Sequence, residues 1–262
     1  MSFSKRLEKA RIAFLQRAAS GKSVVIARPF KEAHGGAGAY VGDLVYGGLD
    51  GIVTTFAIVS GVAGAQLGAH IILILGVANL LADGFSMATG AYLSVKSQRE
   101  YYDWERQKES REVEAFPDSE LLELYDIYRD QGYSEADART LVEIKSRNPE
   151  RLVDAMMIEE LNMLPSEQKP FHSGLATFIA FILAGAVPLL AYLFGLFFVI
   201  EADVAFFVSL GLSALTLFGL GAAKKFVTNR SPLKSGLEMM LVGGLAAAVA
   251  YTVGALLKGL GQ

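Results

Sequence analysis

Cysteine is absent from this chain of 262 residues, and histidine occurs only three times. The sequence therefore excludes disulfides and thiolate metal ligands. Any metal site has to use carboxylate, carbonyl or thioether groups, or His34, His70 and His172. No glycine-rich phosphate loop is present. No cleavable signal peptide is visible either, because the N-terminal segment is basic and lacks a compact apolar core.

Apolar residues make up 52% of the chain, and the mean hydropathy of +0.37 is too high for a soluble domain of this size. The excess lies in five runs, each with the roughly 20 residues that a helix needs to cross a bilayer. These runs are 42–64, 70–95, 172–198, 203–223 and 235–257. We therefore predict an all-α, multi-pass membrane protein with five transmembrane helices.

A polar block, residues 96–169, separates the second run from the third. It contains 19 of the 27 acidic residues but only 11 of the 24 basic ones, a net charge of −8. Its periodicity predicts helices at 96–115, 118–131, 134–146 and 149–163, with starts marked by Asp118, by Ser134 with Asp137, and by Asn148 before Pro149. The first of these helices continues the second apolar run without a break. The predicted division is 1–40, a basic amphipathic helix (2–19) with a linker; 41–95, the first two spans; 96–169, a helical domain; and 170–262, the last three spans.

Lysine and arginine predict the orientation in the membrane. Eight precede the first span, eleven lie in the polar block and four lie between the fourth and fifth spans, whereas Lys258 alone falls on the other side. The positive-inside rule then predicts that the N-terminus and the polar block are cytoplasmic and that the C-terminus is outside. The lack of a long targeting extension favours a prokaryotic plasma membrane, with a vacuolar membrane as the alternative.

Carboxylates inside the apolar runs indicate an ion pathway, since each costs about 2.5–3.5 kcal/mol at mid-span. Asp43 and Asp50 are seven residues apart and share one face of the first span. Asn79, Asp83 and Met87 form a second stripe, at i, i+4 and i+8 of the second span. A thioether beside carboxylates favours softer divalent ions such as Fe²⁺, Co²⁺ or Zn²⁺. The alternatives are purely structural roles: a helix cap for Asp43, interhelical hydrogen bonding for Asn79 and core packing for Met87.

A second group of acids lies in the polar block. Glu105, Glu109 and Glu112 share one helical face, and Glu120 and Glu123 share a face of the next helix. On the last polar helix Met156 and Glu160 are four residues apart, with Met157 and Glu159 adjacent to them. A bound divalent cation would neutralise the stacked carboxylates. An ordinary solvated face with salt bridges to Arg106, Lys108 and Arg111 remains open at this point.

Several motifs together resemble the vacuolar iron transporter family. They are DGIVTTFAIVSG in the first span, DGFSMATGAYLSVKS leaving the second, the glutamate-rich helix that follows, and MMIEEL before the third. The resemblance covers roughly residues 40–257 and implies a homodimer that exchanges Fe²⁺ and other divalent metals, manganese among them, for protons. It implies a pore between the first spans, with pore roles for Asp43, Asp50 and Met87. It also implies metal-gathering roles for Glu109, Glu112, Glu120, Glu123, Glu160, Met156 and Met157; Glu105 and Glu159 are added from helical facing.

One position departs from the family pattern: Asn79 stands where relatives usually have a glutamate, and a carboxylate follows one turn later at Asp83. The predicted function is transport of Fe²⁺ out of the cytoplasm, by a protein that is not an enzyme and holds no prosthetic group. The alternative is a membrane-tethered, ferritin-like iron-binding or oxidase protein, which normally needs Glu-x-x-His pairs. No histidine follows a glutamate at that spacing here. A nucleic-acid partner is not expected, because the polar block is acidic.

Overall fold

The computed structural model describes residues 38–225 and 231–258. All regular structure in these ranges is helical, which confirms the predicted all-α class. The predicted N-terminal amphipathic helix, at 2–19, lies outside the described residues. Five helical segments are long and apolar enough to cross a membrane, by length and composition, and they match the five predicted runs: Gly38–Gly64, Ala69–Ala115, Pro170–Phe194, Ala202–Ala223 and Pro232–Leu257.

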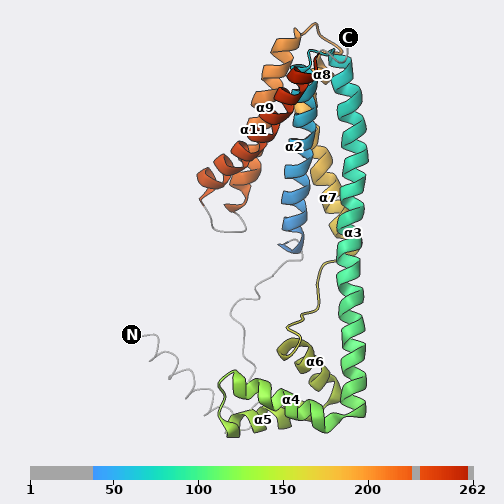
Figure 1. The fold of residues 1–262 in the computed structure, drawn as a ribbon, viewed down its shortest axis with the longest axis vertical. Coiled ribbons are helices and arrows are strands. Elements are labelled where there is room, and N and C mark those ends of the chain that lie inside the picture. Colours follow the sequence, from blue (N-terminus) through green and yellow to red (C-terminus); the bar gives the residue numbers. More distant parts are fainter. Residues whose placement is uncertain (1–37, 226–230, 259–262) are drawn as a thin grey trace, which may run out of the picture. The chain divides into compact units, whose positions relative to one another are not determined.

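Helix α2 (Val41–Gly64), preceded by the short 3₁₀ turn η1 (Gly38–Tyr40), is packed on several sides. It contacts α7 (Pro170–Gly185), α11 (Pro232–Leu257), α3 (Ala69–Ala115) and α9 (Ala202–Ala223) (Figure 1). Glycine permits such close approaches: a Cβ at Gly47, for example, would lie 2.5 Å from the Thr177 carbonyl oxygen of α7. The helix that carries Asp43 and Asp50 is thus held tightly by its neighbours.

Helix α3 joins the apolar and the charged parts of the chain in one element of 47 residues. No proline interrupts the sequence between Ala69 and Ala115, so the hydrogen-bonding ladder continues as the composition changes. At 1.5 Å per residue the helix is about 70 Å long, more than twice the thickness of the hydrocarbon core. The predicted continuation without a break is therefore confirmed (Figure 1).

The third span differs from the prediction, which treated 172–198 as one helical run. Helix α7 ends at Gly185, and the chain continues as the 3₁₀ turn η2 (Val187–Leu189) and the short helix α8 (Leu190–Phe194). Pro188 accounts for the break, because proline cannot donate a backbone hydrogen bond and its ring clashes with the preceding turn. The buried hydroxyl of Ser209 in α9 donates to the Pro188 carbonyl at 2.7 Å.

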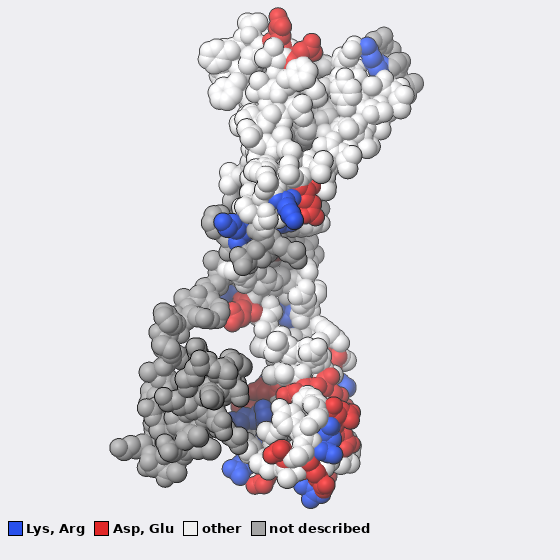
Figure 2. All heavy atoms as spheres, turned by 90° about the vertical axis from the view of Figure 1, so that its left-hand side faces the viewer, with Lys and Arg blue, Asp and Glu red and all other residues white. Residues whose placement is uncertain are grey.

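Three short helices follow α3: α4 (Pro117–Asp130), α5 (Glu135–Ser146) and α6 (Pro149–Glu159). Helices α4 and α6 pack on α3, and α5 packs on α4 and α6. Ser134 and Asn148 cap α5 and α6 as predicted, by accepting hydrogen bonds from backbone N–H groups of the first turn. Asp118 does not cap α4, since that helix already begins at Pro117. On the face drawn in Figure 2, charged side chains are dense over these helices and sparse over the apolar ones.

Helix α6 ends four residues before the predicted position 163. Asn162 adopts a left-handed conformation, with φ of 53°, which asparagine tolerates better than most residues. The chain turns there, and Leu161 and Met163 fold back onto the core of the short helices. The apolar pattern continues past the end of α6 because these two residues, half-buried, pack on the core from the turn that follows the helix.

Candidate functional site

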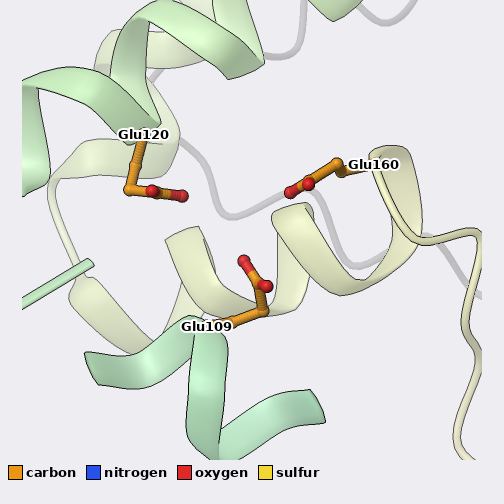
Figure 3. A group of neighbouring side chains, drawn as sticks. All are labelled: Glu109, Glu120 and Glu160. Atoms are coloured by element: carbon orange, nitrogen blue, oxygen red, sulfur yellow. The ribbon is translucent and has the colours of Figure 1, made fainter. Parts of the chain in front are cut away.

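Three glutamates converge between the charged half of α3 and the short helices. Glu109 lies on α3, Glu120 lies in the first turn of α4, and Glu160 is the C-cap residue of α6. One carboxylate oxygen from each lies within 4.8 Å of the others, and Figure 3 shows the three side chains pointing toward one another. Two oxygens bound to one divalent ion at about 2.0–2.6 Å lie at most about 5 Å apart. The spacing therefore fits a shared cation.

Glu109 is the most deeply placed member of this cluster. Its side chain is 1% exposed, and neither carboxylate oxygen has a hydrogen-bond partner. Burial is the main reason that the pKa of Glu109 is raised to about 7, and repulsion from Glu160 and Glu112 adds to it. A buried carboxylate without hydrogen bonds is costly unless a cation compensates it. The Glu109 carboxylate can therefore bind a metal ion, and its burial gives an energetic reason for a cation to bind there.

The other two carboxyl groups respond to the same surroundings. Burial raises the pKa of Glu120 and of Glu160, and in both cases repulsion from Glu123 is the next cause. Glu112 contributes a smaller repulsion to all three members of the cluster. Negative charge is therefore concentrated around one point, which favours a small cation of high charge.

The predicted glutamate ligands thus fall into two groups. Glu109, Glu120 and Glu160 meet directly, the first two buried and Glu160 exposed, whereas Glu112, 40% exposed, and the exposed Glu123 lie outside the group of three. Glu105 is buried one turn before Glu109 and interacts with the Tyr101 hydroxyl, whose pKa it raises. That Glu105, Glu109 and Glu112 share one face of α3 could be predicted from spacing. That Glu120 and Glu160 would meet it depends on how three helices pack.

The predicted thioether ligands lie in the apolar interior. Met156 and Met157 are fully buried in a core that includes Val113, Leu124 and Leu152. Core packing alone accounts for that burial, so their role as ligands stays a prediction. Glu159, adjacent to the cluster, accepts a hydrogen bond of 2.9 Å from the Gln131 side chain.

The competing interpretation of an ordinary salt-bridged face holds for only part of the helix. Arg106 pairs with Asp154 of α6, and Arg111 donates to the backbone carbonyl of Gln107. Lys108 alone of these three bases reaches the glutamates: its Nζ lies 3.7 Å from Glu109 Oε1 and 3.5 Å from Glu112 Oε2. One ammonium does not balance the carboxylates gathered there.

The stripes predicted in the membrane are brought together in part. Asp50 on α2 and Asp83 on α3 are both half-buried and lie close enough for electrostatic interaction. Asp43 is half-buried near the start of α2, and one of its carboxylate oxygens has no hydrogen-bond partner. Asn79 has a buried side-chain amide nitrogen that is likewise unpartnered. These groups form a line of polar atoms within otherwise apolar helices.

Three other side chains of the membrane helices, among them the predicted ligand Met87, have simpler placements. Met87 is half-buried and packs against the apolar core between α2, α3 and α7. Glu238 of α11 is exposed, which fits a side chain that reaches the interface. The hydroxyl of Thr54 on α2 donates to the backbone carbonyl of Asp50 at 2.8 Å, so it supports the helix locally.

A comparison with known protein families covers both groups of carboxylates. A sequence profile of the VIT family matches residues 41–255, a range that includes both the membrane carboxylates and the glutamate cluster. The chain belongs to the VIT family.

Relatives of this VIT-family chain are similar over most of its length. A vacuolar iron transporter of Toxoplasma gondii is 41% identical over 227 residues, covering 84% of this chain and 74% of that protein. One of Plasmodium falciparum is 36% identical over 221 residues, covering 82% and 81%. Vacuolar iron transporter 1 of Arabidopsis thaliana is 32% identical over 221 residues, covering 84% and 87%. The resemblance predicted from the motifs is confirmed.

Proposed function

We propose that this VIT-family chain carries Fe²⁺, and other divalent transition metals, out of the cytoplasm across a membrane in exchange for protons. The observation that carries the proposal is Glu109, a buried carboxylate without hydrogen bonds that faces Glu120 and Glu160. The same helix, α3, also carries Asp83 in its apolar half, close to Asp50 of α2. The relatives are named vacuolar iron transporters, which supports iron as the cargo.

Capture is the first step of the proposed mechanism. The acidic helices 96–169 face the cytoplasm and raise the local concentration of divalent cations. Glu109, Glu120 and Glu160 supply one oxygen each, and Glu112 and Glu123 add charge around them. Oxygen ligands bind Fe²⁺ and Mn²⁺, and the thioethers of Met156 and Met157 are proposed to favour the softer ions of this set.

Passage through the membrane is assigned to the carboxylates of the first two spans. The ion passes Asp43, loses water, and binds Asp50 with Asp83 and Met87 beside it. Protons from the far side compete for the same carboxylates, because a proton and a metal ion occupy the same oxygen lone pairs. Two copies of the chain are proposed to form the path between their first spans. Leu44 and Tyr46 of α2, 43% and 63% exposed in one chain, would contribute to that seam.

The proposed orientation keeps the N-terminus and residues 96–169 in the cytoplasm and the C-terminus outside, following the distribution of lysine and arginine. A prokaryotic plasma membrane is the proposed location, with a vacuolar membrane as the alternative that the relatives' names favour. The ferritin-like alternative is weaker: among the described residues the convergent acidic group contains glutamates and no histidine.

The test is Fe²⁺ flux into proteoliposomes, with and without an imposed pH gradient, for the unaltered chain and for Asp50→Asn. Glu238→Gln is the matched control, since it removes an exposed carboxylate from another span. We expect gradient-dependent flux that Asp50→Asn abolishes and Glu238→Gln leaves intact. Full flux in Asp50→Asn contradicts the proposed pathway, and flux that ignores the gradient contradicts proton exchange.

A further inference from the structure

Lys108 occupies an unusual place for a surface lysine, at the edge of the glutamate cluster. It lies on α3 between Glu105 and Glu112, and its side chain is 44% exposed. Its Nζ atom is 3.7 Å from Glu109 Oε1 and 3.5 Å from Glu112 Oε2. The first distance is too long for a hydrogen bond, so both oxygens of Glu109 stay without one. The ammonium is near the cluster without filling it.

The charge of Lys108 reaches every member of the cluster. It is the cation that offsets the repulsion among Glu109, Glu120 and Glu160, and no second base within the described ranges has that effect on all three. The neighbouring bases point elsewhere, Arg106 to Asp154 and Arg111 to a backbone carbonyl of its own helix. Without metal, Lys108 is therefore the available counter-charge.

We propose that Lys108 is a tethered counter-cation that competes with the metal ion for the glutamate cluster, and so limits how tightly and for how long the metal is held. The inference rests on the proposed metal capture by Glu109, Glu120 and Glu160. A lysine has a flexible stem and a compact charge. When a divalent ion enters, like-charge repulsion drives the half-exposed ammonium toward solvent. When the ion leaves, the ammonium returns and restores the balance of charge.

The consequence is a site that releases its ion readily. A cluster of three carboxylates without an internal cation would bind a divalent ion more tightly and lose it more slowly. A site that passes its ion on has to release it at a useful rate. Lys108 would act on the metal through the carboxylates, as a positioning residue that sets affinity and residence time.

The experiment uses the full chain in lipid nanodiscs and Mn²⁺ as the probe, because free aqueous Mn²⁺ gives an electron paramagnetic resonance signal that is lost on binding. Affinity is measured for the unaltered chain, Lys108→Gln, Lys108→Arg, Lys96→Gln and Glu109→Gln. Lys96→Gln is the matched control: Lys96 also pairs with a glutamate four residues later, Glu100, at 3.7 Å, but away from the cluster. Dissociation is followed by stopped-flow mixing with excess chelator.

We expect Lys108→Gln to bind Mn²⁺ about five- to tenfold more tightly and to release it correspondingly more slowly, the scale of a screened charge interaction. Raising the salt concentration shrinks the difference. Lys108→Arg, which keeps the charge, and Lys96→Gln behave like the unaltered chain. Unchanged or weaker binding by Lys108→Gln, with binding still lost in Glu109→Gln, overturns the inference alone. Equal binding by Glu109→Gln and the unaltered chain overturns the capture site and the inference together.

Discussion

Replacing Glu109 by glutamine removes a buried charge and preserves the size of the side chain. In the metal-free protein the pKa of Glu109 is about 7 instead of 4.5. At 1.36 kcal/mol per pKa unit, ionisation of this carboxyl costs about 3 kcal/mol more in the folded domain than in the unfolded chain. Because the folded-state pKa is raised, this contribution to stability is complete below pH 4.5 and is lost as the pH rises through about 7.

The metal-free Glu109→Gln variant should therefore be more stable than the unaltered protein at pH 8, by up to about 3 kcal/mol, and should lose most of that advantage at pH 5. For a domain the size of the polar block, residues 96–169, 1 kcal/mol corresponds to roughly 4–8 °C in the midpoint of thermal unfolding. With Mn²⁺ at 1,000 times its Kd the order should reverse, since only the unaltered protein gains about 4.1 kcal/mol from binding.

Unfolding can be followed by the fluorescence of a natural tryptophan. Trp104 is the single tryptophan of the chain. It lies on the charged half of α3 and stacks against Tyr101 with ring centroids 6.3 Å apart, so its fluorescence reports unfolding of the polar helices. Glu143→Gln is the control, because Glu143 is 72% exposed and pairs with Arg147 away from the cluster. A loss of metal-free stability at pH 8 in Glu109→Gln would refute the reasoning, since it would mean that the ionised carboxylate is well compensated.

Three further outcomes are expected. Mn²⁺ affinity should rise about tenfold per pH unit below pH 7 and level off above it, because binding displaces the proton of Glu109; a flat profile between pH 5.5 and 8 in the spin-resonance titration contradicts this. Gly51→Ala should lower the midpoint of heat-induced aggregation in detergent, at a cost of about 1–3 kcal/mol, because its Cβ would press on the backbone of α7. Gly42→Ala on the same helix, with nothing within 4 Å, should leave that midpoint unchanged. Asn148→Ala should cost about 1 kcal/mol by removing the cap of α6, and a Trp104 unfolding curve identical to that of the unaltered protein would count against the cap.

Local chemistry made much of the fold predictable. Hydropathy set the five spans, and the absence of proline between Ala69 and Ala115 allowed the continuous helix. The two misplaced helix ends have specific causes. Pro188 interrupts the third span from within a uniformly apolar run, and Asn162 turns the chain while the residues on either side of it remain apolar. In both places hydrophobic periodicity continues although the backbone changes direction.

The candidate site was predictable in its helical faces and not in its assembly. Spacing alone indicates that Glu105 and Glu109 point the same way, and both are buried. The meeting of Glu109 with Glu120 and Glu160 depends on the angles among α3, α4 and α6, which no local pattern encodes. The different partners of Lys108 and Arg106 could not be predicted for the same reason. Arg106 pairs with Asp154, whose position depends on how α6 packs, whereas Lys108 stays near the glutamates.

The unbroken course of α3 also limits how the sequence can change in length. From Asp83 to Glu109 the helix advances 26 residues, about 39 Å. One residue inserted after Val95 would turn the glutamate face by about 100° relative to the membrane stripe, whereas seven would turn it by only about 20°. The far end of the polar helices is fixed as well, because the Lys169 backbone N–H donates to the Tyr40 hydroxyl at 2.9 Å. Homologous chains should therefore vary in length here by near-whole helical turns and not by single residues.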